Sequence, residues 1–93
     1  MQLKPGTRIY YNGDMANRNG FGVITKREEA NKYAPPQVFI KMDDGREMWI
    51  MEMAFSKEYL GHGGTRFVTE WAYKKWKSEQ MKKLQEWANR KTV

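Results

Sequence analysis

The sequence predicts a mainly β domain that ends in a single α-helix. Residues 5–55 contain short segments in which apolar and polar residues alternate, and such alternation is typical of strands. From about residue 70 the apolar residues recur at helical spacing instead. The 93 residues have room for one core, so we expect a single domain, with strands as far as residue 69 and a helix over 70–91.

Residues that favour turns separate the expected strands. Pro5 and Gly6 precede the first strand, an Asn- and Gly-rich loop follows it, and two prolines precede the third. Gly20 and Gly22 indicate a bulge or a close approach of the backbone at the start of the second strand. The expected strands span residues 8–11, 21–26, 37–42 and 46–52.

The third and fourth strands are expected to form a hairpin around Asp43-Asp44-Gly45. A three-residue loop with a left-handed glycine is a common hairpin connection, and it places Lys41 opposite Glu47 and Phe39 opposite Trp49. The outward face then carries Phe39, Trp49 and Met51. The core face carries Val38, Ile40, Met42, Met48 and Ile50.

The segment 65–69 allows two interpretations. It is either a fifth strand or the start of a helix that is buried on two sides, and its β-rich composition favours the strand. The helix that follows has an apolar stripe, for which the outward face with Phe39, Trp49 and Met51 is the expected cover. The alternatives are a homodimer through the helix, or an aromatic face left open for a partner. The stripe contains Tyr73, Trp76, Leu84 and Trp87.

The first half of the chain resembles a known group of small barrels. Gly6 to Gly13, followed by Gly20 to Ile24, is similar to the glycine-punctuated run of the KOW group, and Asp43-Asp44-Gly45 resembles the hairpin of Tudor-like barrels. The resemblance covers residues 5–55. It implies an SH3-like five-stranded barrel, and the KOW group would imply a role with RNA or in elongation. The fold that we expect is this barrel with the C-terminal amphipathic helix packed on it.

Charge points to an acidic partner. The chain has 17 basic and 11 acidic residues, a net charge of +6, and seven of the cations lie in residues 69–93. Such an excess suits nucleic acid or an acidic protein surface and argues against a mimic of DNA. We therefore expect a non-enzymatic nucleic-acid-binding module, and the alternative is a protein-binding adaptor or inhibitor that docks on a larger complex.

Nine residues are the candidates for nucleic-acid contacts, because cations can hold phosphates and aromatic rings can stack on bases. The expected phosphate contacts are Arg8, Arg18, Lys26, Arg27, Lys75 and Lys82. The expected stacking residues are Tyr10, Tyr11 and Trp49.

Other classes of protein fit the sequence less well. There is no cysteine and one histidine, His62, in a glycine-rich loop, so we expect no catalytic residue, no metal site and no cofactor. The first residues lack the apolar core of a signal peptide, and no apolar run is long enough to cross a membrane. We expect a cytoplasmic protein with no membrane partner.

Overall fold

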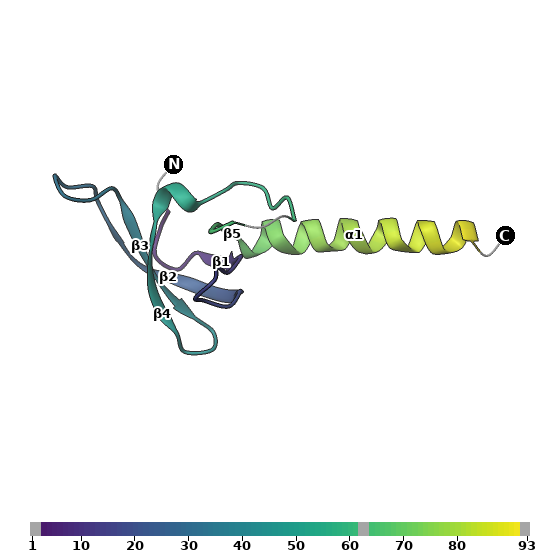
Figure 1. The fold of residues 1–93 in the computed structure, drawn as a ribbon, viewed down its shortest axis with the longest axis horizontal. Helices are drawn as coiled ribbons and strands as arrows, with labels where there is room; N and C mark the ends of the chain where they lie inside the picture. The colour runs from purple at the N-terminus through teal and green to yellow at the C-terminus, as the bar shows by residue number, and fades with distance from the viewer. Residues whose placement is uncertain (1–2, 62–63, 92–93) are drawn as a thin grey trace.

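The computed structural model describes residues 3–61 and 64–91, which form an antiparallel sheet followed by a long helix (Figure 1). The strand order is β4-β3-β2-β1-β5. The sheet is not closed, and a barrel is therefore not confirmed. The strands are β1 (Arg8–Tyr11), β2 (Gly20–Glu28), β3 (Gln37–Met42), β4 (Glu47–Met51) and β5 (Phe67–Thr69). A 3-10 turn, η1 (Glu52–Ala54), follows β4, and the helix α1 spans Glu70–Lys91.

The β3–β4 hairpin has the register predicted from the sequence. Lys41 lies opposite Glu47 and Phe39 lies opposite Trp49. The loop is closed by the Met42 N–H, which donates to the Arg46 carbonyl at 2.7 Å. Gly45 has a φ of 96°, a left-handed conformation that favours glycine, so local turn chemistry sets the register.

The second strand is longer than expected, and its irregularity lies further along than the glycines suggested. The register of β2 against β3 shifts between Ile24 and Lys26, so of the two alternatives predicted at Gly20 and Gly22 the bulge is not the one that the strand adopts. The predicted close approach is confirmed at Gly22. A Cβ there would lie 2.8 Å from the Lys41 carbonyl oxygen and 3.0 Å from the Ile40 side chain.

The core lies on the inner face of the bent sheet, on the side predicted from the alternation in β3 and β4. Met48 is half-buried and packs against this core. Ile9 and Tyr11 of β1 join it, whereas Tyr10 points to the outer face, as alternation along a strand requires. The buried cluster contains Leu3, Ile9, Tyr11, Ile24, Val38, Ile40, Met42, Ile50 and Phe67.

The fifth strand is confirmed, and it runs into the helix without a linker. Phe67 to Thr69 pair with β1, and α1 begins at Glu70, as the sequence predicts. Thr69 ends the strand and caps the helix, because its Oγ1 accepts a hydrogen bond from the Ala72 N–H at 3.1 Å. The start of α1 is thus fixed at the β1–β5 end of the sheet.

The expected packing of α1 on Phe39, Trp49 and Met51 is wrong. Trp49 and Met51 keep 45% and 48% of their surface exposed. Only the first turns of α1 contact the outer face, at its other end, and the helix then projects away from the sheet (Figure 1). The molecule is consequently 62 Å long and about 27 Å wide. Because α1 starts directly after β5, at one end of the sheet, it cannot also cover β4 at the other end.

The close approach at Gly22 gives a stability prediction. Gly22→Ala is expected to lower the free energy of unfolding by about 1–3 kcal/mol, because the new methyl group meets backbone that cannot move freely. Gly20→Ala is the control on the same strand, since its Cβ meets only the flexible ends of the Met42 and Arg46 side chains, at 3.2 and 3.4 Å. Urea denaturation measures both, and equal losses would contradict the packing described here.

Candidate functional site

A cluster of aromatic rings anchors α1 to the outer face of the sheet. The Tyr10 ring stacks on the Tyr73 ring with centroids 3.7 Å apart, and Phe21 and Tyr59 meet this pair edge-on. Trp76 adds a second helical ring, 4.8 Å from that of Tyr59. Tyr10 is only 5% exposed, so it holds the helix and has no free face on which a base could stack.

Tyr11, the second tyrosine predicted to stack on bases, is in the core and 1% exposed. Its hydroxyl donates a hydrogen bond to Asp14, and the Ala16 and Asn17 N–H groups donate to the same carboxylate at 2.7 Å. These bonds, that of Tyr11 first, lower the pKa of Asp14 to about 2. Tyr11 and Asp14 therefore shape the first loop, and the prediction of base stacking by Tyr10 and Tyr11 is corrected by their burial.

Arg8 is paired with carboxylates on two sides. Its guanidinium donates two hydrogen bonds to Asp43, at 2.7 and 2.6 Å, and it lies 3.3 Å from Glu70. The hydrogen bonds from Arg8 lower the pKa of Asp43 and that of Glu70. Arg8 thus joins the hairpin turn to the first turn of α1, and it would have to leave both carboxylates to bind a phosphate.

Arg27 is paired as well, and it is largely buried. Its Nε and Nη2 donate to Glu52 at 2.5 and 3.0 Å, and the two side chains are 12% and 17% exposed. The hydrogen bonds from Arg27 lower the pKa of Glu52. The pair fixes η1 to β2, which is a structural role. No local sequence pattern indicates this pair, because the two residues are 25 positions apart.

The other five predicted contacts remain open to solvent, and the structure brings two of them, Lys26 and Trp49, together. Trp49 packs beside Phe39 with ring centroids 5.0 Å apart, and the Lys26 ammonium lies 5.7 Å from the Trp49 centroid. Arg18 is in the first loop and its side chain is 84% exposed. Lys75 and Lys82 are exposed on α1, which leads away from β3 and β4 (Figure 1).

The outer half of α1 is exposed to solvent, whereas the sequence predicts that its apolar stripe is buried against the sheet. We define the outer half as residues 80–90. The stripe that begins with Tyr73 and Trp76 on the sheet continues there, past the point where any strand lies beneath it. Met81, Leu84 and Trp87 are 52%, 59% and 57% exposed.

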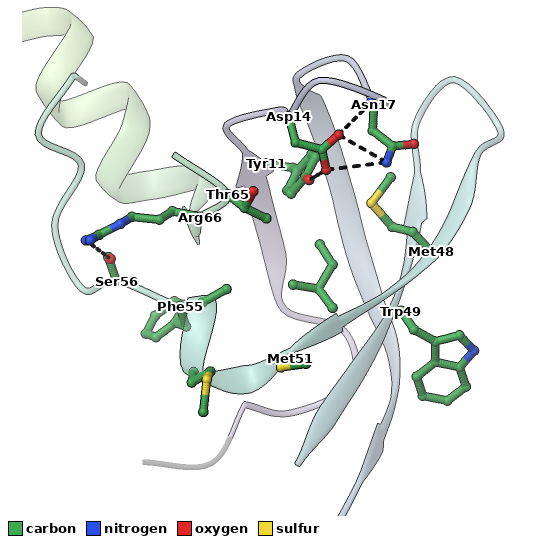
Figure 2. A pocket seen from close by; sticks show the side chains of 13 residues that line it. Tyr11, Asp14, Asn17, Met48, Trp49, Met51, Phe55, Ser56, Thr65 and Arg66 are labelled. Atoms are coloured by element: carbon green, nitrogen blue, oxygen red, sulfur yellow. Dashed lines mark hydrogen bonds between the residues drawn. The ribbon is translucent and has the colours of Figure 1, made fainter. Parts of the chain in front are cut away.

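A second feature that sequence reasoning missed is a pocket of about 600 Å³ beside β4 (Figure 2). Met48 to Met51 form one wall, and Arg66 and Ser56 lie on the side opposite Trp49. The pocket exists because the sheet is open between β4 and the segments that follow η1. Sequence alternation cannot reveal such a gap, since the same pattern would serve a closed barrel.

Metal and membrane sites have no support in the described parts of the chain. Over residues 3–61 and 64–91, no group of three or more His, Cys, Asp or Glu side chains could hold a metal ion. No helix in these segments is long and apolar enough to span a membrane. His62 lies outside the described residues.

Comparisons with protein-family models, with curated proteins and with solved structures give no match. The function must therefore be argued from the exposed surfaces themselves.

The aromatic anchor gives a second stability prediction. Tyr73→Ala should lower the free energy of unfolding by about 2–3 kcal/mol, because it removes the ring that stacks on Tyr10. Leu84→Ala on the exposed part of the same stripe should change it by less than about 0.5 kcal/mol. Chemical denaturation of both variants measures the difference, and a large loss in Leu84→Ala would show that the outer half of α1 is covered.

Proposed function

We propose that the protein is a non-enzymatic binding module that docks on an acidic protein partner through the outer half of α1. The carrying observation is that this helix stays apolar beyond the sheet, where Met81 and Leu84 are each more than half exposed. Exposed apolar surface that adjoins a packed cluster is typical of interaction sites. An amphipathic helix that lies in a groove is also a common mode of protein recognition.

Charge narrows the class of partner. Between residues 74 and 90 the helix carries six cations and two glutamates, a net charge of +4. A second copy of the same helix would bring the same charge and repel it. Nucleic acid would bind the cations but leave the apolar stripe in water. A protein with an apolar groove and an acidic rim matches both features of the helix.

The sheet supports a related proposal about the fold, namely an SH3-like barrel that is incompletely closed. The chain has the five short strands that the resemblance implies, and β5 returns to pair with β1. Phe55 and Phe67 form an isolated parallel bridge, and the Ser56 N–H donates to the Phe67 carbonyl at 2.9 Å. These contacts bring the segment after β4 toward β5 without closing the sheet.

A capture experiment tests whether the outer half of α1 docks on an acidic protein. The chain is used as bait in nuclease-treated extract of the cells that encode it. Met81→Ala/Leu84→Ala should reduce capture of one specific acidic protein by about tenfold or more, since each apolar contact at the centre of an interface contributes about 1 kcal/mol or more. Tyr33→Ala is the control, because Tyr33 is 85% exposed and lies on the loop between β2 and β3. Capture that is unchanged in the double variant would contradict the proposal.

Nucleic acid is the second candidate, and one observation favours it. Lys26 lies over the exposed Trp49 ring, beside Phe39 and with Lys41 on the same face, which is an arrangement that can stack a base and hold a phosphate. This candidate predicts binding of labelled single- or double-stranded DNA or RNA that weakens steeply with salt.

Fluorescence anisotropy at low and physiological salt separates the two candidates. Nucleic acid binding at this face should be lost in Trp49→Ala, and binding along the helix should be lost in Lys75→Glu/Lys82→Glu. Met81→Ala/Leu84→Ala should leave either kind of nucleic acid binding intact. Absence of binding at low salt would remove the nucleic acid candidate and leave the protein partner.

A further inference from the structure

The strand β4 is at the edge of the sheet, and its outward backbone groups can be assigned. In an antiparallel pair, alternate residues direct their N–H and C=O groups toward the partner strand. Met42 bonds to Arg46 and Glu52 bonds to Pro36, so even-numbered residues of this segment face β3. Glu47, Trp49 and Met51 therefore direct their backbone groups away from β3. Among the described residues, no strand pairs with this edge.

The pocket lies directly along this edge. Four consecutive residues, Met48 to Met51, line it. Since successive side chains of a strand point to opposite faces, four in a row can line one pocket only where the edge of the strand faces it. Figure 2 shows Arg66 and Ser56 across the pocket from Trp49, so the space lies between the β4 edge and the chain near β5.

The edge has few of the features by which proteins prevent strand pairing, since its one charged residue, Glu47, lies at the hairpin end opposite Lys41. Exposed edges usually carry a lysine, a proline or a bulge. The β4 sequence EMWIM has neither lysine nor proline, and its register against β3 is regular. The pocket volume of about 600 Å³ is within the range of ligand sites. Three methionines in its lining, Met48, Met51 and Met53, can adapt to different side chains.

We propose that the β4 edge and this pocket bind an extended peptide segment of a partner protein, which joins the sheet as a sixth strand. Main-chain hydrogen bonds to Glu47, Trp49 and Met51 supply affinity, and every second peptide side chain enters the apolar pocket. This site is separate from the outer half of α1 and does not depend on the function proposed for the helix.

Charged residues on the pocket wall indicate the composition of the peptide. Arg66 is exposed, and its hydrogen bond to Ser56 is long, at 3.4 Å, so its guanidinium can take a carboxylate. The Asp14 carboxylate is occupied by the Tyr11 hydroxyl and by two N–H groups and offers nothing to an acid. The expected ligand alternates apolar and polar residues and has an acidic residue beside Arg66.

Met51 offers a substitution that tests the backbone pairing itself. Its φ of −63° is the value that proline requires, and its N–H faces away from β3. Met51→Pro therefore removes one outward donor without strain. Met51→Ala removes the same side chain and keeps the donor, so the two variants differ in the hydrogen bond that the proposal needs.

The probe is a library of labelled peptides about the length of β4. Threonine occupies alternate positions, large apolar residues are varied at the others, and glutamate is at one end. The tightest member should bind Met51→Pro roughly tenfold more weakly than Met51→Ala, because one main-chain hydrogen bond is lost. Methylation of alternate backbone nitrogens of the peptide should have a similar effect, and Arg66→Ala should weaken binding through the loss of the ion pair.

Three results would overturn the proposal. One is that no library member binds at concentrations up to millimolar. Another is that Met51→Pro and Met51→Ala bind the peptide equally, which would make the pocket a site for apolar side chains without strand addition. The third is a concentration-dependent dimer in sedimentation that Met51→Pro abolishes, which would assign the edge to a second copy of the chain.

Discussion

The stacked rings of Tyr10 and Tyr73 determine how the rest of the molecule is arranged. They hold the first turns of α1 on the outer face, and β5 enters the helix with no linker that could redirect it. Because the Tyr10 ring is buried between the sheet and α1, it cannot contact a ligand, but it fixes the direction of the helix. Two surfaces stay open as a result, namely the outer half of α1 and the Phe39–Trp49 face of the sheet.

Local patterns predicted much of the fold. Alternation in residues 37–42 and 47–51 gave the buried face, and Gly45 gave the turn and hence the register. The β-rich composition of the segment before Glu70 likewise predicts the strand that is found there. The location of the helix could not be predicted in this way, because it depends on which of two aromatic surfaces the stripe meets. An exposed tyrosine that stacks on a ligand and a tyrosine that covers Tyr73 have the same sequence pattern in β1, so the pattern does not identify Tyr10 as the cover.

The candidate site was predicted less well than the fold, because its residues interact with partners that are far away in the sequence. Arg8 and Arg27 find carboxylates 35 and 25 positions away, which no local pattern shows. Trp49, Arg18, Lys26, Lys75 and Lys82 remain exposed, but they are spread over the sheet and the helix of a molecule 62 Å long. The β4 edge and the outer half of α1 point to different parts of that molecule, so occupation of one need not block the other.

In the structure the sheet holds the first turns of α1, while the outer half projects beyond it and leaves Met81 and Leu84 more than half exposed (Figure 1). Hydrogen–deuterium exchange of the dilute protein tests it residue by residue. We expect slow exchange of amides near Trp76 and much faster exchange over residues 82–90, where no strand supports the helix and its own stability is marginal. Equal, slow exchange along the whole helix in the free protein would contradict the account, because it would show that the outer half is already covered.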